Sequence, residues 1–415
     1  MGGNGAVAPH AAATRTGHQA QRTVVDPSDT DADVVTAFHP DSESERTLLY
    51  GTNHVEIQPS SGATGNLAGS SQTFTFSNDV DAIGDVYAKL AFTYDKTVGT
   101  STTFADLGGA EHFATRLIKR CEVMVGNSTW QTMENSDIVA LNMTTLEPAA
   151  YAQLVEMSSK SAASGAADPS GLPTDDASVS MVCYVPLKIF TAGGTARTHL
   201  TAGAPHQSFR IKLTFLTPTE AGGDVKNLTC QLFARQHIMT NFERDQIRNN
   251  TIVKSLRLTQ HAEKTVTGNT ASQTLNIELD SFSLLASHLL LSFDATGTAG
   301  QSSLTNAFVE TAELLLNTSS HSGELDGHFM RSFAASDMGL YPNFKYDEDS
   351  RSNMGVYVFP LASLAYGADG CPLNRFDTIR LKVKGVFPGC LCSVTCVGTA
   401  SAVYSKQAAS LQYHS

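Results

Sequence analysis

The chain has 415 residues, of which 41 % are hydrophobic and 16 % are charged, and its formal net charge is −12. At roughly 100–200 residues per domain, this length predicts two or three domains. The acidic balance argues against a surface that wraps nucleic acid, because such a surface needs a basic patch or stripe. Seven cysteines are few and odd in number. They do not suggest a disulfide framework, so a reducing compartment is the simpler expectation.

Residues 1–45 are expected to form an N-terminal arm, because residues 1–23 are small and polar and offer little to bury. No apolar stretch follows a basic one, so we expect no signal peptide. The first residues begin like a myristoylation signal, but Ala6 stands where that signal requires Ser or Thr. No apolar run approaches the ~20 residues of a membrane-spanning helix.

After the arm, short runs of alternating apolar and polar residues predict half-buried β-strands. In the first half of the chain these runs lie at 86–92, 182–187, 209–215 and 228–238. Two segments, 111–120 and 135–146, are the best helix candidates, and both are short enough to be connections. Residues 157–178 are mostly Ser, Ala, Gly, Pro and Asp, which predicts a long surface loop.

A charged segment at 241–250 interrupts the β pattern and predicts an inter-domain linker with room for a helical turn. Strand patterns then resume and continue to the C-terminal region, at 256–258, 275–279, 289–293, 312–316, 356–359, 379–383 and 391–404. Strand clusters without long interleaved helices are typical of sandwiches and barrels. We therefore predict an all-β chain with one domain at 46–242, a linker at 243–250 and a second domain at 251–415.

The sequence carries no nucleophile elbow, P-loop, zinc motif or dinucleotide fingerprint, and its thirteen histidines are scattered. We therefore expect no catalytic residue, no cofactor and no metal site. Cys390, Cys392 and Cys396 are spaced so that all three share one face of a strand. Buried thiols behave as small hydrophobes, whereas a soft-metal cluster would need a fourth ligand, and Cys371 is only a remote candidate.

An acidic cluster and a set of glycosylation sequons can each be interpreted either as ordinary surface or as a functional site. Asp347-Glu348-Asp349 is the densest acidic cluster, but it lacks the oxygen spacing of a calcium loop, so we expect a solvated loop. Asn-x-Ser/Thr sequons are frequent by chance in a Thr-rich chain, and exposed ones are candidate glycosylation sites. The five candidates are Asn127, Asn142, Asn227, Asn249 and Asn317.

Several motifs keep their order along nearly the whole chain and carry a family resemblance. They are a Gly-Asp strand start at 83–87, a Pro-Leu-aromatic segment at 185–190, an aromatic strand at 357–361 and a turn at 370–377. Together they resemble the double jelly-roll major capsid proteins of nucleocytoplasmic large DNA viruses, in particular those of iridoviruses and phycodnaviruses. The chain departs from the family turn at Asn374 and Arg375, which are adjacent here.

The resemblance implies two tandem eight-stranded jelly-roll β-sandwiches with short connecting helices. It also implies a structural role rather than an enzymatic one: a homotrimeric, pseudo-hexagonal capsomer that tiles the facets of an icosahedral virion and assembles in the host cytoplasm. The expected partners are neighbouring capsomers, penton and minor capsid proteins. Direct contact with nucleic acid is not expected, and contact with an internal membrane layer would be indirect, through minor proteins. The loop at 157–178 is then the candidate for an exposed tower or inter-subunit loop.

Other functions remain open at this stage. The chain could instead be a minor or penton jelly-roll capsid protein. Jelly rolls also host lectins, so a carbohydrate-binding β-sandwich is a second alternative, and an enzyme such as a cupin or hydrolase is a third. Trp130, the only tryptophan, is expected to be a core or interface anchor.

Overall fold

The computed structural model describes most of the chain from Tyr50 to Tyr413. The described residues are 50–63, 65–77, 79–95, 113–159, 178–190, 199–217, 225–268, 271–295, 307–321, 323–341, 356–361, 370–387, 389–405 and 407–413. Three predictions therefore lie outside the described residues: the N-terminal arm at 1–45, nearly all of the loop at 157–178, and the acidic cluster at 347–349. Among the described residues, no helix is long and apolar enough to cross a membrane.

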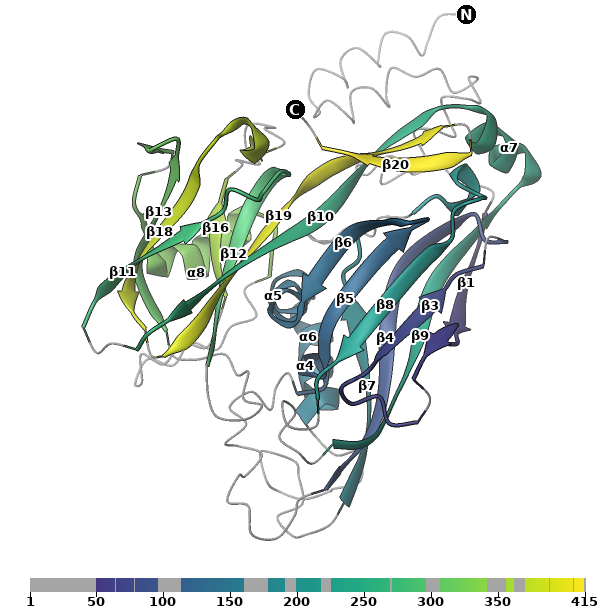
Figure 1. Ribbon diagram of the computed structural model, residues 1–415, viewed down its shortest axis with the longest axis horizontal. Helices are drawn as coiled ribbons and strands as arrows, with labels where there is room; N and C mark the ends of the chain where they lie inside the picture. Colours follow the sequence, from purple (N-terminus) through teal and green to yellow (C-terminus); the bar gives the residue numbers. More distant parts are fainter. Residues whose placement is uncertain are drawn as a thin grey trace, which may run out of the picture.

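Residues 50–239 form a sandwich of two antiparallel sheets (Figure 1). Sheet 1 has four strands, in the spatial order β1 (Tyr50–Ile57), β9 (Val225–Met239), β4 (Ala82–Asp95) and β7 (Ser178–Leu187). Sheet 2 has five, in the order β2 (Ser61–Gly62), β3 (Ser71–Thr75), β8 (Phe209–Phe215), β5 (Ile118–Val125) and β6 (Ser128–Glu134). Strand β8 shows the cause of this layering, because every second residue is buried from Phe209 to Phe215.

Residues 252–412 form a second sandwich beside the first. Sheet 3 has the order β10 (Ile252–Val266), β19 (Cys390–Ser405), β12 (Leu285–Ala295) and β16 (Tyr357–Pro360), with β17 (Cys371–Pro372) on β12 and β20 (Ala408–Gln412) on β19. Sheet 4 has the order β11 (Gln273–Glu278), β18 (Ile379–Val386), β13 (Phe308–Leu316) and β14 (Ser319–Ser320), with β15 (Leu325–Asp326) on β13.

The two sandwiches have the same topology. When β2, β15, β17 and β20 are set aside and the remaining strands of each half are numbered in chain order, sheets 1 and 3 both read 1-8-3-6, and sheets 2 and 4 both read 2-7-4-5. This is the eight-stranded jelly-roll order, in which two four-stranded antiparallel sheets pack face to face. The prediction of two tandem eight-stranded jelly rolls is confirmed.

Five helices connect the described strands, and the sequence predicted some of them but not others. The structure has α4 (Phe113–Arg116), α5 (Asn135–Thr145), α6 (Pro148–Ser159), α7 (Asn241–Asn249) and α8 (Gly327–Asp337). The helix predicted at 135–146 is confirmed as α5. The helix predicted at 111–120 is wrong over its last four residues, because α4 ends at Arg116 and β5 begins at Ile118. Helices α6 and α8 were not predicted, and the predicted linker contains the full helix α7 rather than one helical turn.

Helix α7 is fixed to the first jelly roll by a buried carboxylate. Arg244 Nε lies 2.6 Å from Asp81 Oδ1 and Arg244 Nη2 lies 2.9 Å from Asp81 Oδ2. The Asp81 side chain is 3 % exposed and also accepts the backbone N–H of Met239 at 2.7 Å. Bidentate Arg–carboxylate pairs are both strong and directional. The connection between the two jelly rolls is therefore anchored where it leaves the first one.

Candidate functional site: the seam between the two jelly rolls

A cluster of buried polar side chains lies where the two jelly rolls meet. Helix α5 sits between the sandwiches and faces β12 and β19 of sheet 3 (Figure 1). Its ten residues from Ser136 to Thr145 are all buried, although a helix on the surface of a single domain would expose one side. The second jelly roll covers the side of α5 that would otherwise be exposed.

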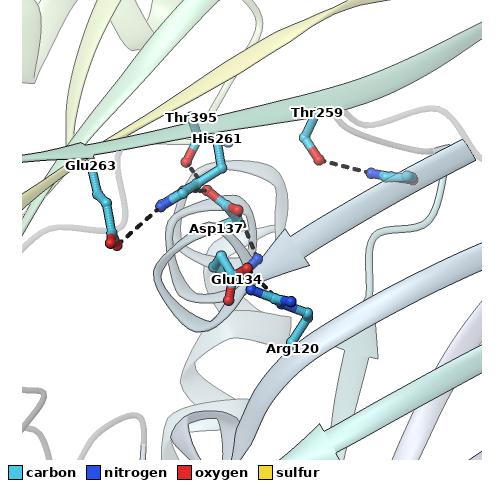
Figure 2. A network of polar contacts seen from close by, with 8 residues as sticks. Arg120, Glu134, Asp137, Thr259, His261, Glu263 and Thr395 are labelled. Carbon is cyan, nitrogen blue, oxygen red and sulfur yellow. Dashed lines mark hydrogen bonds and ion pairs between the residues drawn. The ribbon is translucent and has the colours of Figure 1, made fainter. Parts of the chain in front are cut away.

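Asp137 of α5 is the centre of this cluster (Figure 2). Its side chain is fully buried, and its Oδ1 accepts hydrogen bonds from His261 Nδ1 at 2.9 Å and from the Thr395 hydroxyl. Its Oδ2 accepts the backbone N–H of Glu134 at 2.8 Å, which completes a capping box at the start of α5. One carboxylate therefore starts a helix of the first jelly roll and binds two strands of the second, β10 and β19.

His261 is held in its charged form by this arrangement. Burial alone would lower its pKa, but the hydrogen bond and the negative charge of Asp137 outweigh burial and raise the pKa to about 9. Glu263 Oε2 lies 3.6 Å from His261 Nε2 and adds to the rise. At neutral pH the seam therefore contains a buried imidazolium–carboxylate pair.

A second buried ion pair joins α4 to β12. Arg116 Nη2 lies 3.3 Å from Asp294 Oδ1, and the two side chains are 7 % and 8 % exposed. Burial raises the pKa of Asp294, and the charge and hydrogen bond of Arg116 oppose that rise. Buried pairs of this kind add little net stability but are costly to break, because removal of one partner leaves an uncompensated charge. They therefore favour one specific docking of the two sandwiches.

The end of β19 enters the first jelly roll. Tyr404 is fully buried, and its hydroxyl lies 3.0 Å from His199 Nδ1 and accepts the Leu200 N–H at 3.3 Å. A Cβ on Gly203 would lie 2.9 Å from the Tyr404 ring, so this close approach requires glycine. Burial lowers the pKa of His199 to about 3, which keeps the imidazole neutral. Strand β19 of the second jelly roll thus contributes Tyr404 to the packing of the first.

An open cleft of about 380 Å³ runs along the same seam, between β6 of the first jelly roll and β10 of the second. Gln131 Nε2 bridges the two strands by donating to Thr259 Oγ1 at 2.9 Å. Trp130 lines the cleft and is 5 % exposed, and its ring lies 5.6 Å from that of His199. The expectation that Trp130 is a core or interface residue therefore agrees with its position in the structure.

The five sequons are spread over both jelly rolls. Asn127, Asn227, Asn249 and Asn317 are exposed, whereas Asn142 is fully buried in α5 and donates to the Pro186 carbonyl at 3.2 Å. In the folded chain, a glycan on Asn142 would have to displace the α5 packing. Asn317 also has a structural role, since its Oδ1 accepts the N–H groups of Asp377 and Thr378 at 2.9 and 3.1 Å.

The cysteines lie as the strand spacing predicted. Cys390, Cys392 and Cys396 are fully buried on β19. Burial raises the pKa of Cys390 to about 11 and that of the other two further still. Thiols held in the neutral form are poor metal ligands and poor nucleophiles. Within the described part of the chain, no group of three or more His, Cys, Asp or Glu side chains could hold a metal ion.

Known structures share this double arrangement over almost the whole chain. VP54 of the virus PBCV-1 matches with a TM-score of 0.67 at 12 % identity, covering 89 % of this chain and 98 % of that one. The chain has the double jelly-roll fold. The Faustovirus major capsid protein matches with a TM-score of 0.61 at 8 % identity (88 % and 92 % covered), and the mavirus major capsid protein with 0.53 at 13 % (87 % and 90 % covered).

Sequence comparison is less sensitive for this chain than structure comparison. No family model and no curated protein matches its sequence. The resemblance to double jelly-roll capsid proteins is confirmed at the level of the fold, because the matched structures span both jelly rolls. At identities of 8–13 %, the conserved property is the strand order rather than the individual side chains.

Sequence reasoning missed the residues that join the jelly rolls. Asp137 and His261 were not singled out, although Glu134 and Asp137 are spaced as a capping box at the start of a predicted helix. That spacing could have predicted the local cap. It could not predict His261, which is 124 residues further along the chain.

Proposed function

We propose that this protein is a major capsid protein, a structural subunit and not an enzyme. The single observation that supports this most strongly is the pair of complete jelly rolls with identical strand order, because the major capsid proteins of Faustovirus and mavirus match 88 % and 87 % of the chain. Residues 46–242 and 251–415 are the two capsid domains in this proposal, joined through 243–250.

In this proposal the chain forms homotrimers, and each trimer is a pseudo-hexagonal tile with six jelly rolls around its axis. The equal topology of the two halves supports this, because two similar modules per chain give three chains six similar footprints. The rigid seam supports it as well: ion pairs at Asp137 and Asp294 and the inserted Tyr404 fix the angle between the modules. A tile needs that angle to be constant.

The tiles would pack side by side in the facets of an icosahedral virion assembled in the host cytoplasm, next to penton and minor capsid proteins. The net charge of −12 supports a shell whose subunits do not bind the genome directly. Any contact with an internal membrane layer would then pass through minor proteins. Exposed sequons at Asn127, Asn227, Asn249 and Asn317 are the glycosylation sites that this proposal retains.

The test is the mass and outline of the purified full-length chain. Light scattering after size exclusion should give three times the 44.1 kDa chain mass, and negative-stain images should show particles with a roughly hexagonal outline. A monomer that stays monomeric at high protein concentration would contradict the proposal. So would a particle with two-fold symmetry.

A further inference from the structure

Helices α5 and α8 occupy equivalent places in the two jelly rolls. Each lies between the fifth and the sixth strand of its own module: α5 between β6 and β7, and α8 between β15 and β16. Each has 11 residues, and each follows an acidic N-cap residue, Glu134 or Asp326. The two helices can therefore be compared position by position from the cap.

The comparison shows that α5 packs against the other jelly roll at these positions, whereas α8 exposes its side chains there. The third and seventh residues of α5 are Asp137 and Leu141, both fully buried; Asp137 bonds to sheet 3. The third and seventh residues of α8 are Phe329 and Phe333, which are 36 % and 66 % exposed. The opposite side of α8 is buried against its own jelly roll. An exposed pair of phenylalanines one helical turn apart is unusual on a protein that acts alone.

The surface that α5 contacts also has an equivalent. Helix α5 lies against the outer side of sheet 3, on β12 and β19, and the corresponding strands of sheet 1 are β4 and β9. On sheet 3 this outer side is buried and carries the hydroxyl groups of Ser292, Ser393 and Thr395 beside Leu290. On the outer side of sheet 1, the described residues include exposed apolar groups.

Aromatic side chains gather on that side of sheet 1. Tyr184 of β7 is 37 % exposed, and its ring lies 5.8 Å from the ring of Phe233 on β9 in an edge-to-face arrangement. Lys89 Nζ lies 5.8 Å from the centre of the same Phe233 ring, and Val182, two residues before Tyr184, is 49 % exposed. The contacts on each sheet suit the helix that faces it: Asp137 of α5 bonds to an imidazole and a hydroxyl on sheet 3, and the phenylalanines of α8 would pack on the Tyr184 and Phe233 rings of sheet 1.

We propose that the Phe329–Phe333 face of α8 packs on the outer side of sheet 1 of a second copy of this chain. This contact repeats, between subunits, the contact that α5 makes with sheet 3 within one subunit. Such a head-to-tail interface uses two different surfaces, so it generates a closed ring when the rotation per subunit allows it. The inference rests on the proposed homotrimer and identifies the two surfaces that build it.

The test uses single charged substitutions on each surface. Phe333→Glu and Val182→Glu should each convert the trimer into a folded monomer, because each variant would bury a carboxylate that has no partner. Val182 is chosen on sheet 1 because its cross-strand neighbour is Ala91, whereas Tyr184 stands opposite Lys89, which would pair with a carboxylate. Val253→Glu is the matched control, since Val253 is 56 % exposed on β10 and belongs to neither surface; it should leave the trimer intact. Light scattering gives the mass, and circular dichroism shows that each variant is folded.

A cross-linking experiment keeps the inference testable if a charged variant fails to fold. All seven native cysteines are buried, so a chain with both Phe333→Cys and Tyr184→Cys should react with a short bis-maleimide to give covalent dimers and trimers. Each single variant should give neither. Trimers that persist in both glutamate variants, together with no cross-linked product from the double variant, would overturn this inference and leave the proposed capsomer standing. A monomeric wild type would overturn both.

Discussion

The two jelly rolls have one topology but differ in what their outer surfaces face. In the second, the outer side of sheet 3 is covered by α5 of the same chain, and its Thr395 hydroxyl donates to Asp137. In the first, the outer side of sheet 1 carries Tyr184 and Val182, which are 37 % and 49 % exposed. The difference shows that one fold can carry two kinds of surface: a buried, ion-paired seam within the chain and an exposed surface with aromatic side chains.

The largest effect is expected from breaking the seam at its centre. Asp137→Ala leaves the His261 imidazolium buried without its partner and also removes the cap of α5. We expect a loss of roughly 3–5 kcal/mol in the free energy of unfolding, measured by chemical denaturation. Glu263→Gln is the control, because Glu263 faces the same imidazole but is 59 % exposed, and it should cost less than about 1 kcal/mol. Equal losses in both variants would contradict a buried ionic seam.

The next largest effect is a loss of folding stability as the pH becomes alkaline. The pKa of His261 is about 9 in the folded chain, against 6.5 for an unperturbed imidazole. A raised folded pKa means that the stabilisation is complete below pH 6.5 and is lost as the pH rises through 9. At about 1.4 kcal/mol per pH unit, the loss approaches about 3 kcal/mol.

The measurement compares wild type with His261→Gln by denaturant unfolding from pH 6 to pH 10. The wild type should lose more stability than the variant over this range, because the variant cannot release that proton. Tyrosine and lysine side chains titrate in both proteins and cancel in the difference. Parallel curves for the two proteins would show that His261 is not charged in the folded state.

A smaller effect is expected from removing one hydroxyl at the end of β19. Tyr404→Phe deletes the contacts with His199 and the Leu200 N–H, at a cost of about 1–2 kcal/mol. Tyr357→Phe is a matched change within the second jelly roll, where the Tyr357 hydroxyl bonds to Ala307 and Val309. Hydrogen exchange should increase at 199–204 only in the first variant and at 307–309 only in the second. Increased exchange at 199–204 in both would mean that the tyrosine does not act locally.

The smallest effect is expected at the exposed edge of the same network. Arg120 Nε lies 2.7 Å from Glu134 Oε1, but the two side chains are 49 % and 26 % exposed. Solvent screens such a pair, so Arg120→Met should change the free energy of unfolding by less than about 1 kcal/mol. A loss as large as that of Asp137→Ala would show that the rim of the seam, and not its buried centre, holds the jelly rolls together.

Most of the fold could be predicted because strand periodicity is a local property. The segment 209–215 alternates in sequence and alternates in burial as β8. Helix α5 was predicted from a short segment between strands. Helix α8 was not predicted, because Phe329 and Phe333 are apolar residues on its exposed side and so break the usual alternation of an apolar and a polar helix face. Helix α6 was missed next to a segment poor in apolar residues.

The candidate site could not be predicted to the same extent, because its partners are far apart in the chain. Local sequence placed Cys390, Cys392 and Cys396 on one buried face, and the spacing of Glu134 and Asp137 could have predicted the cap of α5, although that prediction was not made. The pairing of Arg116 with Asp294 joins residues 178 positions apart. No periodicity or motif carries that information, so such pairs appear only when both sandwiches are docked.

By itself, the sequence determined an all-β chain of two similar halves with a charged connection between them. Its alternating patterns act on neighbouring residues, and burial of one side of each strand is enough to set the sandwiches. Only the tertiary structure decided which outer sheet is covered and which is open. That choice depends on where α5 lies relative to sheet 3, and it makes Asp137 a buried partner of His261 while the equivalent Phe329 of α8 stays exposed.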